Sequence, residues 1–294
     1  MDLLHDGQPF GVREAAATGL SRQRLRSRVL AGKVRRVLVG VYVDARVPES
    51  ISLRAAALAK VTPPDMVVCR GTAAWLLGVP PVEPNRHQGV PEIELASPAG
   101  RNGTRRGDCV GSSALLDEGD VIEVDGVPVT SGVRTCLDLA RHRDRPDALA
   151  YVDALVRHGV AAKRQLLDAL CRLDGLPWAE QGREIVELCD PRAESPGESW
   201  LRLRHLDAGF PPPEPQLRVL DEAGRPVVRL DLGLLAQRVA EEYDGEEFHG
   251  RDQQPRDTAR RSWLETRDWT LLSFGKGEVL GRGFAFERAV GEAL

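Results

Sequence analysis

The chain has 294 residues, of which 42% are hydrophobic and 29% are charged, so it has the composition of a globular protein with room for two or three domains. No stretch approaches the roughly 18 consecutive apolar residues of a membrane helix, and the first residues lack the features of a signal peptide, so we expect a cytoplasmic protein without membrane contact. The net charge of −4 is unevenly spread, because residues 1–80 carry 12 Lys and Arg against 6 Asp and Glu, whereas the remainder carries 28 against 38. At physiological salt, charges more than about 8 Å apart are largely screened from each other. The basic N-terminal part can therefore attract phosphates although the whole chain is acidic.

The first 43 residues have the pattern of a winged helix-turn-helix. Residues 10–17 suit a short helix, and residues 18–20 suit a turn. Ser21 can cap a second helix that runs to Ala31 and stops at Gly32. The β-branched stretch 33–43, with a bend at Gly40, predicts the strands of a wing.

Basic side chains crowd the second helix and the wing, and no acidic residue interrupts them. A run of charge often marks only a solvated surface, but at this position it favours DNA binding. We expect the second helix to enter the major groove and the wing to contact phosphates. The candidate DNA-binding residues are Arg22, Arg24, Arg26, Arg28, Lys33, Arg35 and Arg36.

The middle of the chain, residues 63–190, predicts a mixed α/β domain. An apolar segment at 67–70 is followed by strands at 92–96 and 108–112 and by a hairpin at 121–130 that turns at Asp125-Gly126. Helices are expected at 72–77, 134–141, 147–157 and 163–171. The five cysteines are odd in number and form no C-x-x-C pair, which argues against a disulfide framework or a thiolate zinc site.

The last part, residues 191–294, predicts the order α-β-β-β-α-β. A helix at 198–208 is followed by strands at 217–221, 227–232 and 239–244, a helix at 256–267 and a strand at 269–274. The chain is therefore expected to be an α/β multidomain protein with domains at 1–62, 63–190 and 191–294.

Acidic residues in this last part are spaced so that they converge. If the strands around residues 236 and 237 form a hairpin, Asp231 lies opposite Glu242, where two like charges are destabilising. Asp244 shares a strand face with Glu242, and Glu198 can lean over that face from its helix. A divalent cation, Mg²⁺ or Mn²⁺, would relieve the repulsion and activate water near a phosphate. The alternative is a set of ordinary solvated acids.

The same residues resemble the PD-(D/E)xK restriction-endonuclease-like superfamily, and within it the very-short-patch-repair-like domain of unknown function. This likeness covers about residues 195–280 and implies a metal-dependent phosphodiesterase with Glu198, Asp231 and Glu242 as its acidic core and metal ligands. The superfamily lysine is absent, and Asp244 stands in its place. A catalytic cation would then come from His249 or Lys276, or the metal would act alone. The matching segments are Ser195-Pro196-Gly197-Glu198-Ser199, Arg229-Leu230-Asp231-Leu232, Glu242-Tyr243-Asp244-Gly245 and Phe248-His249.

His249 is also a candidate general acid or base, because a histidine titrates near neutral pH; a hydrogen-bonded loop histidine is the equal alternative. Glu241 stands where a strand residue that faces the core is normally apolar. Both this acid and the missing lysine leave open a degenerate nuclease domain.

Residues 1 to about 170 resemble the abortive-infection type IV antitoxin and its transcriptional-regulator relatives. This resemblance implies a DNA-binding head followed by an α/β middle domain. Two functions therefore compete: a DNA-binding, metal-dependent endonuclease, and an antitoxin-like regulator with an inactive nuclease domain. Either is compatible with a homodimer. The motifs that carry the likeness are Gly40-Val41-Tyr42-Val43, Gly71-Thr72-Ala73-Ala74 and Pro128-Val129-Thr130-Ser131.

Overall fold

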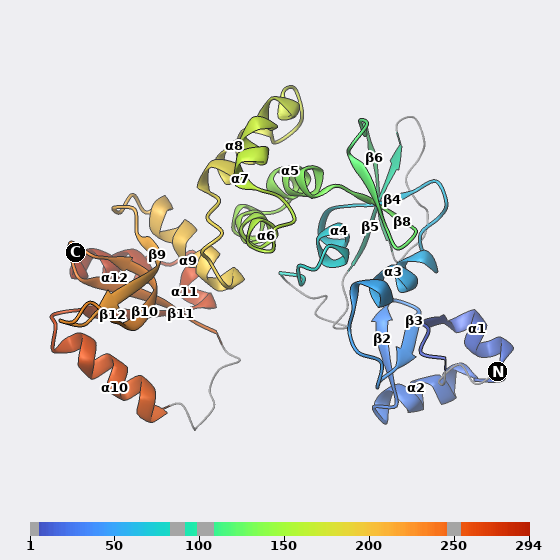
Figure 1. Ribbon diagram of the computed structural model, residues 1–294, viewed down its shortest axis with the longest axis horizontal. Helices are drawn as coiled ribbons and strands as arrows, with labels where there is room; N and C mark the ends of the chain where they lie inside the picture. The colour runs from blue at the N-terminus through green and yellow to red at the C-terminus, as the bar shows by residue number, and fades with distance from the viewer. Residues whose placement is uncertain (1–5, 83–91, 99–108, 246–253) are drawn as a thin grey trace. The chain divides into compact units, whose positions relative to one another are not determined.

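A computed structural model of the chain describes residues 6–82, 92–98, 109–245 and 254–294 (Figure 1). The chain forms two compact units, one made of Met1–Leu139 with Val160–Ala169 and the other of Ala140–Gly159 with Leu170–Leu294. Both mix helices with sheets, so the expected α/β class is confirmed. The three domain boundaries drawn from the sequence stay a prediction.

The first unit begins with two short helices and a three-stranded antiparallel sheet of order β1-β3-β2. The helix expected at 10–17 starts two residues late, because Phe10 and Gly11 pair with β3 instead. Ser21 caps the second helix as predicted, since its hydroxyl accepts a hydrogen bond from Arg24 N at 3.3 Å. The elements are β1 (Phe10–Gly11), α1 (Val12–Ala17), α2 (Arg22–Leu30), β2 (Val34–Leu38) and β3 (Val41–Asp44).

The same unit contains a five-stranded sheet of order β6-β5-β4-β8-β7. The hairpin between β7 and β8 turns at Asp125 and Gly126, whose φ angles of 47° and 80° are those of the predicted Asp-Gly turn. Its strands are β4 (Val67–Val68), β5 (Ile93–Pro98), β6 (Cys109–Ala114), β7 (Val121–Val124) and β8 (Val127–Thr130). The accompanying helices are α3 (Ile51–Ala59), α4 (Arg70–Leu76), α5 (Gly132–His142, whose last three residues belong to the second unit) and α7 (Lys163–Asp168).

One hydrophobic core joins the three-stranded sheet to the five-stranded sheet. Val41 and Val43 of β3 pack in the same cluster as Leu53 of α3, Val68 of β4 and Val129 of β8. The first helices have a smaller core of their own around Phe10, Leu25 and Tyr42. The basic helix α2 therefore packs through Leu25 against a buried core.

The second unit is built on a four-stranded sheet of order β12-β11-β10-β9 (Figure 1). The first three strands in sequence are antiparallel neighbours, and β12 runs parallel to β11, which requires a crossover that contains α10 (Gln254–Glu265). The predicted order α-β-β-β-α-β is confirmed. The strands are β9 (Glu214–Leu220), β10 (Pro226–Leu234), β11 (Val239–Asp244) and β12 (Thr270–Gly275).

Helix α6 (Arg145–Arg157) packs against α8 (Ala179–Leu188) and α9 (Pro196–Asp207) in the second unit. Its residues from Ala148 to Val152 are all buried, which is the pattern of a helix enclosed by its neighbours. The remaining helical elements are η1 (Leu170–Leu173), α11 (Lys276–Val279) and α12 (Ala285–Ala293).

In the parts of the chain that the structure describes, no helix combines the length and the apolar character needed to cross a bilayer.

Candidate functional site

Glu198, Asp231 and Glu242, called the acid site below, come from three neighbouring elements of the second unit. Glu198 lies in the first turn of α9, and its backbone N–H donates to the hydroxyl of the N-cap residue Ser195 at 3.2 Å. Pro196 occupies the first helical position, where its missing N–H costs nothing. The local sequence therefore starts α9 at a defined residue and fixes where Glu198 emerges.

The hairpin of β10 and β11 has the register that the sequence predicts. Leu232 pairs with Glu241 and Gly233 with Ala240, so the next pair along sets Asp231 opposite Glu242. The backbone N–H of Tyr243 donates to Asp231 Oδ2 at 3.1 Å, which ties this carboxylate to the neighbouring strand.

The three carboxylates influence one another. Burial raises the pKa of Asp231, and the nearby charge of Glu242 adds to that rise, while the hydrogen bond from Tyr243 N opposes it. Burial likewise raises the pKa of Glu198, and the charge of Asp231 contributes in the same direction. Two partly desolvated acids, each with a pKa raised by burial and by a neighbouring carboxylate, form an electrostatic arrangement that is typical of functional sites.

Arg260 of α10 neutralises one end of this site. Its guanidinium donates to both carboxylate oxygens of Glu242, with Nη1 at 3.1 Å from Oε2, and also to the carbonyl of Arg229 at 2.9 Å. The Arg229 side chain in turn forms a bidentate ion pair with Glu194 at 2.6 and 2.8 Å. From sequence, Arg260 is one of several arginines on a helix that carries acids as well, so nothing singled it out as the partner of Glu242.

At the other end, Oε2 of Glu198 accepts hydrogen bonds from Glu194 N at 2.9 Å and from Gln216 Nε2 at 2.7 Å. The other amide atom of Gln216, Oε1, is buried and has no hydrogen-bond partner among the described residues. Within the same residues, no three His, Cys, Asp or Glu side chains are arranged to hold a metal ion. The predicted metal ligands Glu198, Asp231 and Glu242 thus do not form such a group, and a cation site here stays a prediction.

The remaining predicted residues of the site fall in different places. Asp244 is exposed at the end of β11. Lys276, one candidate for the missing lysine, holds its Nζ 5.3 Å from the centre of the Trp200 ring. His249, the other candidate, lies outside the described residues.

Glu241, where an apolar residue is expected, is fully buried beside His205 of α9. His205 Nδ1 lies 2.7 Å from Glu241 Oε1, and Nε2 lies 2.8 Å from the carbonyl oxygen of Pro211. Because a carbonyl only accepts, Nε2 carries a proton, and a further proton lies between Nδ1 and Glu241. The pair is therefore neutral overall, which makes a buried acid tolerable. Glu241 and Glu242 are consecutive and contact α9 and α10 respectively, as alternation in a strand requires.

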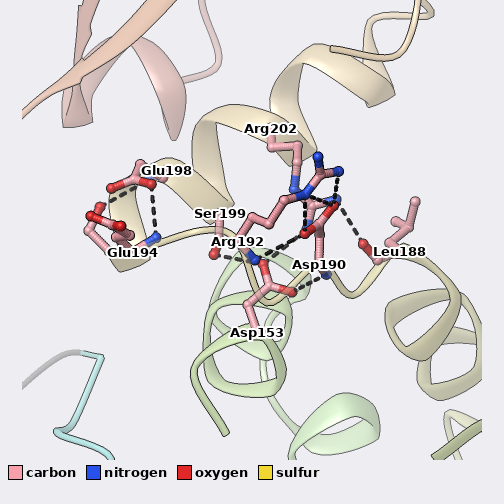
Figure 2. Close-up of polar contacts among 9 residues, drawn as sticks. Asp153, Leu188, Asp190, Arg192, Glu194, Glu198, Ser199 and Arg202 are labelled. Atoms are coloured by element: carbon pink, nitrogen blue, oxygen red, sulfur yellow. Dashed lines mark hydrogen bonds and ion pairs between the residues drawn. The ribbon is translucent and has the colours of Figure 1, made fainter. Parts of the chain in front are cut away.

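A buried network from α6 fixes α9 just behind Glu198 (Figure 2). Asp153, 1% exposed, accepts hydrogen bonds from Ser199 Oγ at 2.8 Å, Arg202 Nη2 at 2.9 Å and Asp190 N at 2.7 Å. Burial raises the pKa of Asp153, and the charge of Arg202 opposes that rise. The sequence does contain a signal for this residue, since Asp153 is a lone acid inside the otherwise apolar run 148–156.

The basic residues of the first unit divide into two groups. Arg22, Arg24, Arg26 and Lys33 are exposed, and Arg28 is half-buried. A cavity of about 430 Å³ beside α2 is lined by three arginines, Arg22, Arg26 and Arg36, over an apolar floor.

Two arginines of β2 are engaged within the chain. Arg35 forms an ion pair with Glu49 at 3.0 Å and donates to the carbonyl of Val47 at 3.1 Å. The guanidinium of Arg36 lies 5.7 Å from the centre of the Tyr42 ring. The exposed arginines of the basic run are thus concentrated on α2.

Comparison with known proteins shows which families and relatives the chain is similar to. Residues 1–43 match the family described as "Transcriptional regulator, AbiEi antitoxin", and residues 66–188 match "AbiEi antitoxin C-terminal domain". Two relatives from Mycobacterium tuberculosis, the uncharacterized protein Rv2248 of strain H37Rv and the uncharacterized protein MT2308 of strain CDC 1551, are each 32% identical over 255 residues, which is 86% of this chain and 89% of theirs. The chain belongs to the family of these two proteins.

In this member of the family, the matches confirm the antitoxin-like resemblance of the first part of the chain. The AbiEi antitoxin C-terminal match ends with α8, so α6 and its Asp153 lie inside it, whereas the acid site follows it. The resemblance of residues 195–280 to a nuclease superfamily stays a prediction.

Proposed function

We propose that the protein is a DNA-binding transcriptional regulator of the antitoxin type, with residues 10–44 as a winged helix-turn-helix head. The observation that carries the proposal is the set of exposed arginines on α2, in a segment that matches a transcriptional-regulator family. Phosphates are the natural partners of clustered guanidinium groups.

The geometry suggests a division of labour within the head. Arg22, Arg24 and Arg26 lie in the first half of α2, the part of a recognition helix that reaches base edges in the major groove. Arginine can donate two hydrogen bonds to a guanine there, which gives sequence preference. Lys33, exposed just before β2, is suited to a phosphate contact.

Binding to duplex DNA that contains the region upstream of the protein's own gene tests this proposal. Arg24→Gln and Arg26→Gln should each weaken binding by about tenfold, the effect of about 1.4 kcal/mol, and should lower the salt dependence by roughly 0.9 for each phosphate that the variant no longer neutralises. Arg164→Gln is the matched control, since Arg164 is an equally exposed arginine of the same unit. Binding by fluorescence anisotropy that is the same for all four proteins would contradict the proposal.

A second function, hydrolysis of DNA phosphodiester bonds with Mg²⁺ or Mn²⁺, is supported by a separate observation. The elements α9, β10 and β11 bring together three acids, two of which, Glu198 and Asp231, have pKa values raised by burial and by a neighbouring acid. A bound cation would polarise a phosphate and activate water. The chain's own side chains would hold the cation through Asp231 and Glu198, and the partly exposed Arg229 and Arg260 could bind phosphate oxygens.

Cleavage of supercoiled DNA separates the two functions. If the second one holds, the wild-type protein nicks DNA with Mg²⁺ or Mn²⁺ and not with EDTA, and Asp231→Asn abolishes nicking. Asp221→Asn is the control, because Asp221 is an acid in the turn between β9 and β10 of the same unit. DNA binding that persists in EDTA, without nicking under any metal condition, would support the regulator and reject the nuclease.

A further inference from the structure

One side of α2 lines the cavity of about 430 Å³ in the first unit. Helical residues spaced three, four and seven apart share a face, and the lining residues of α2 have this spacing: Arg22, Leu25, Arg26 and Val29. Helix α2 packs against β2, which contributes Arg36 to the same cavity. The cavity therefore lies between α2 and the three-stranded sheet, and its volume is in the range of sites for small molecules.

The floor of this cavity is apolar. Leu25 and Tyr42 are buried and belong to the small core of the first helices. Val12 and Val29 are half-buried and pack against that core. An apolar group that covers this floor leaves water and removes apolar surface from it, which is favourable in proportion to the area covered. The floor thus favours a ligand with an apolar body over a bare ion.

The charged side chains around the floor are all cationic. They are those of Arg22, Arg26 and Arg36, and no acid is found among the described residues that line the cavity. The guanidinium of Arg36 lies 5.7 Å from the centre of the Tyr42 ring, so a cationic group stands over the apolar floor. Because a guanidinium only donates hydrogen bonds, the complementary group of a ligand is an anionic acceptor such as a carboxylate.

We infer that this cavity binds a small carboxylate with an apolar body, aliphatic or aromatic, and that the bound ligand competes with DNA. Sugars and bases match the cavity less well, because their donors find an acceptor among the lining side chains only in the Tyr42 hydroxyl. Competition follows because Arg22 and Arg26 line the cavity and are also proposed to reach DNA, so this part rests on the proposed regulator function. A carboxylate that engages them lowers the positive charge available to phosphates, and DNA weakens the carboxylate by the same factor.

The cavity is tested by calorimetric titration of the full chain without DNA. Sodium decanoate is the aliphatic probe and sodium 2-naphthoate the aromatic one, and at least one of them should bind. The uncharged amide of the probe that binds, and inorganic phosphate, which has no apolar body, should bind at least about tenfold more weakly. If neither carboxylate binds, or if the amide or phosphate binds as tightly as the carboxylate, the inference is overturned.

Variants then locate the binding. Arg26→Gln and Arg36→Gln each remove a cation from the cavity and should weaken the carboxylate by at least about tenfold. Arg24→Gln is the matched control, since Arg24 is two positions from Arg26, on another side of α2, and does not line the cavity. It should bind DNA more weakly and the carboxylate like the wild type. Melting curves show whether each variant is folded, and Arg26→Gln decides if Arg36→Gln is not. A folded Arg26→Gln that binds the carboxylate like the wild type, or as weakly as Arg24→Gln does, overturns the inference.

Fluorescence anisotropy with the DNA duplex tests the competition. At fixed ionic strength, a saturating concentration of the carboxylate should raise the Kd for DNA at least about tenfold, while the same concentration of sodium acetate should leave it unchanged. A carboxylate that binds the cavity without weakening DNA binding overturns the competition. A chain that binds no DNA at all overturns the proposed function and the competition with it, whereas the titrations without DNA still decide whether the cavity is a carboxylate site.

Discussion

The pKa values of two aspartates close to the same sheet are shifted in opposite directions: that of Asp231 in β10 is raised, and that of Asp221 in the turn before β10 is lowered. Asp231 is partly buried next to other acids, which raises its pKa, whereas the pKa of Asp221, also partly buried, is lowered by hydrogen bonds from the backbone and side chain of Arg225. A raised acid pKa means that the folded state binds the proton more readily than the unfolded state. Ionised Asp231 therefore costs stability at neutral pH.

We predict that Asp231→Asn stabilises the protein at pH 7. A rise of about 2–4 °C in melting temperature is expected, which corresponds to about 1 kcal/mol in a chain of this size. The gain should shrink as pH falls toward about 4, because wild-type Asp231 then takes up a proton in the folded state and no longer carries its penalty. Thermal melts of both proteins between pH 4 and pH 7 measure this.

Asp221→Asn is the internal contrast, with the opposite sign. Its wild-type carboxylate stabilises the fold above its unfolded pKa, and this contribution disappears as pH falls through the lowered pKa of the folded state. The substitution should thus lower the melting temperature at pH 7 and have little effect in acid. Two variants that shift in the same direction at pH 7 would contradict the electrostatic account.

Cysteine reactivity is a second test of residue environments. Burial raises the pKa of Cys69 and of Cys136 to about 12, whereas Cys171 is exposed. Because the thiolate is the reacting form, Cys171 should give the fast phase with a thiol reagent in the native protein. Cys171→Ser should remove that phase and leave the total thiol count in denaturant lower by one. A fast phase of unchanged amplitude in this variant would contradict the assignment to Cys171, whereas a slower phase from the half-buried Cys109 would not.

The residues of the acid site differ in how far sequence could predict them. Asp231 and Glu242 were predictable because strand register follows from local spacing. Gln216 and Arg260 were not, because their roles depend on which strand joins the far side of β10 and on how α10 crosses the sheet. The burial of Glu241 could not be explained from the local sequence, because its partner His205 lies 36 positions away.

At the level of elements, α9 is held by α6 through Asp153. Asp153→Ala would leave the guanidinium of Arg202 buried without this carboxylate, a change that typically costs about 3–5 kcal/mol. Urea unfolding should report this drop in stability. Asp168→Ala breaks an exposed ion pair with Arg164 and should cost less than about 1 kcal/mol. Similar costs for the two variants would show that the buried network does not anchor α9.

Capping signals explain only part of which helices were predicted, since α4, α6 and α7 were expected from the sequence although no side chain caps them. Ser195 marks the start of α9 with a capping hydrogen bond. Neither α8 nor α12 has a side-chain cap, since they begin after Trp178 and Phe284. Tertiary packing selects these helices, which a local pattern does not reveal. For α3 the signal was present, since Ser50 accepts a hydrogen bond from Leu53 N.

At the scale of the whole molecule, the AbiEi antitoxin match and the compact units do not coincide. The match at 66–188 includes α6 and α8, which belong to the unit that holds the four-stranded sheet. Helix α6 is buried on nearly every side, in part by α9, which begins only at Pro196. The antitoxin-matched segment thus relies on residues beyond its own end.

We therefore predict that a chain truncated after Leu188 does not fold as the full chain does. Without α9, the apolar surface of α6 is exposed and Asp153 is left without both Ser199 and Arg202. The truncated chain should bind a hydrophobic dye more strongly, and proteolysis should cut within residues 140–188, while residues 10–44 in the first unit stay protected. Co-expression of residues 189–294 as a separate chain should restore protection, because it returns α9 to α6. Protection of residues 140–159 in the truncated chain equal to that in the full chain would show instead that the antitoxin-matched segment folds without the C-terminal elements.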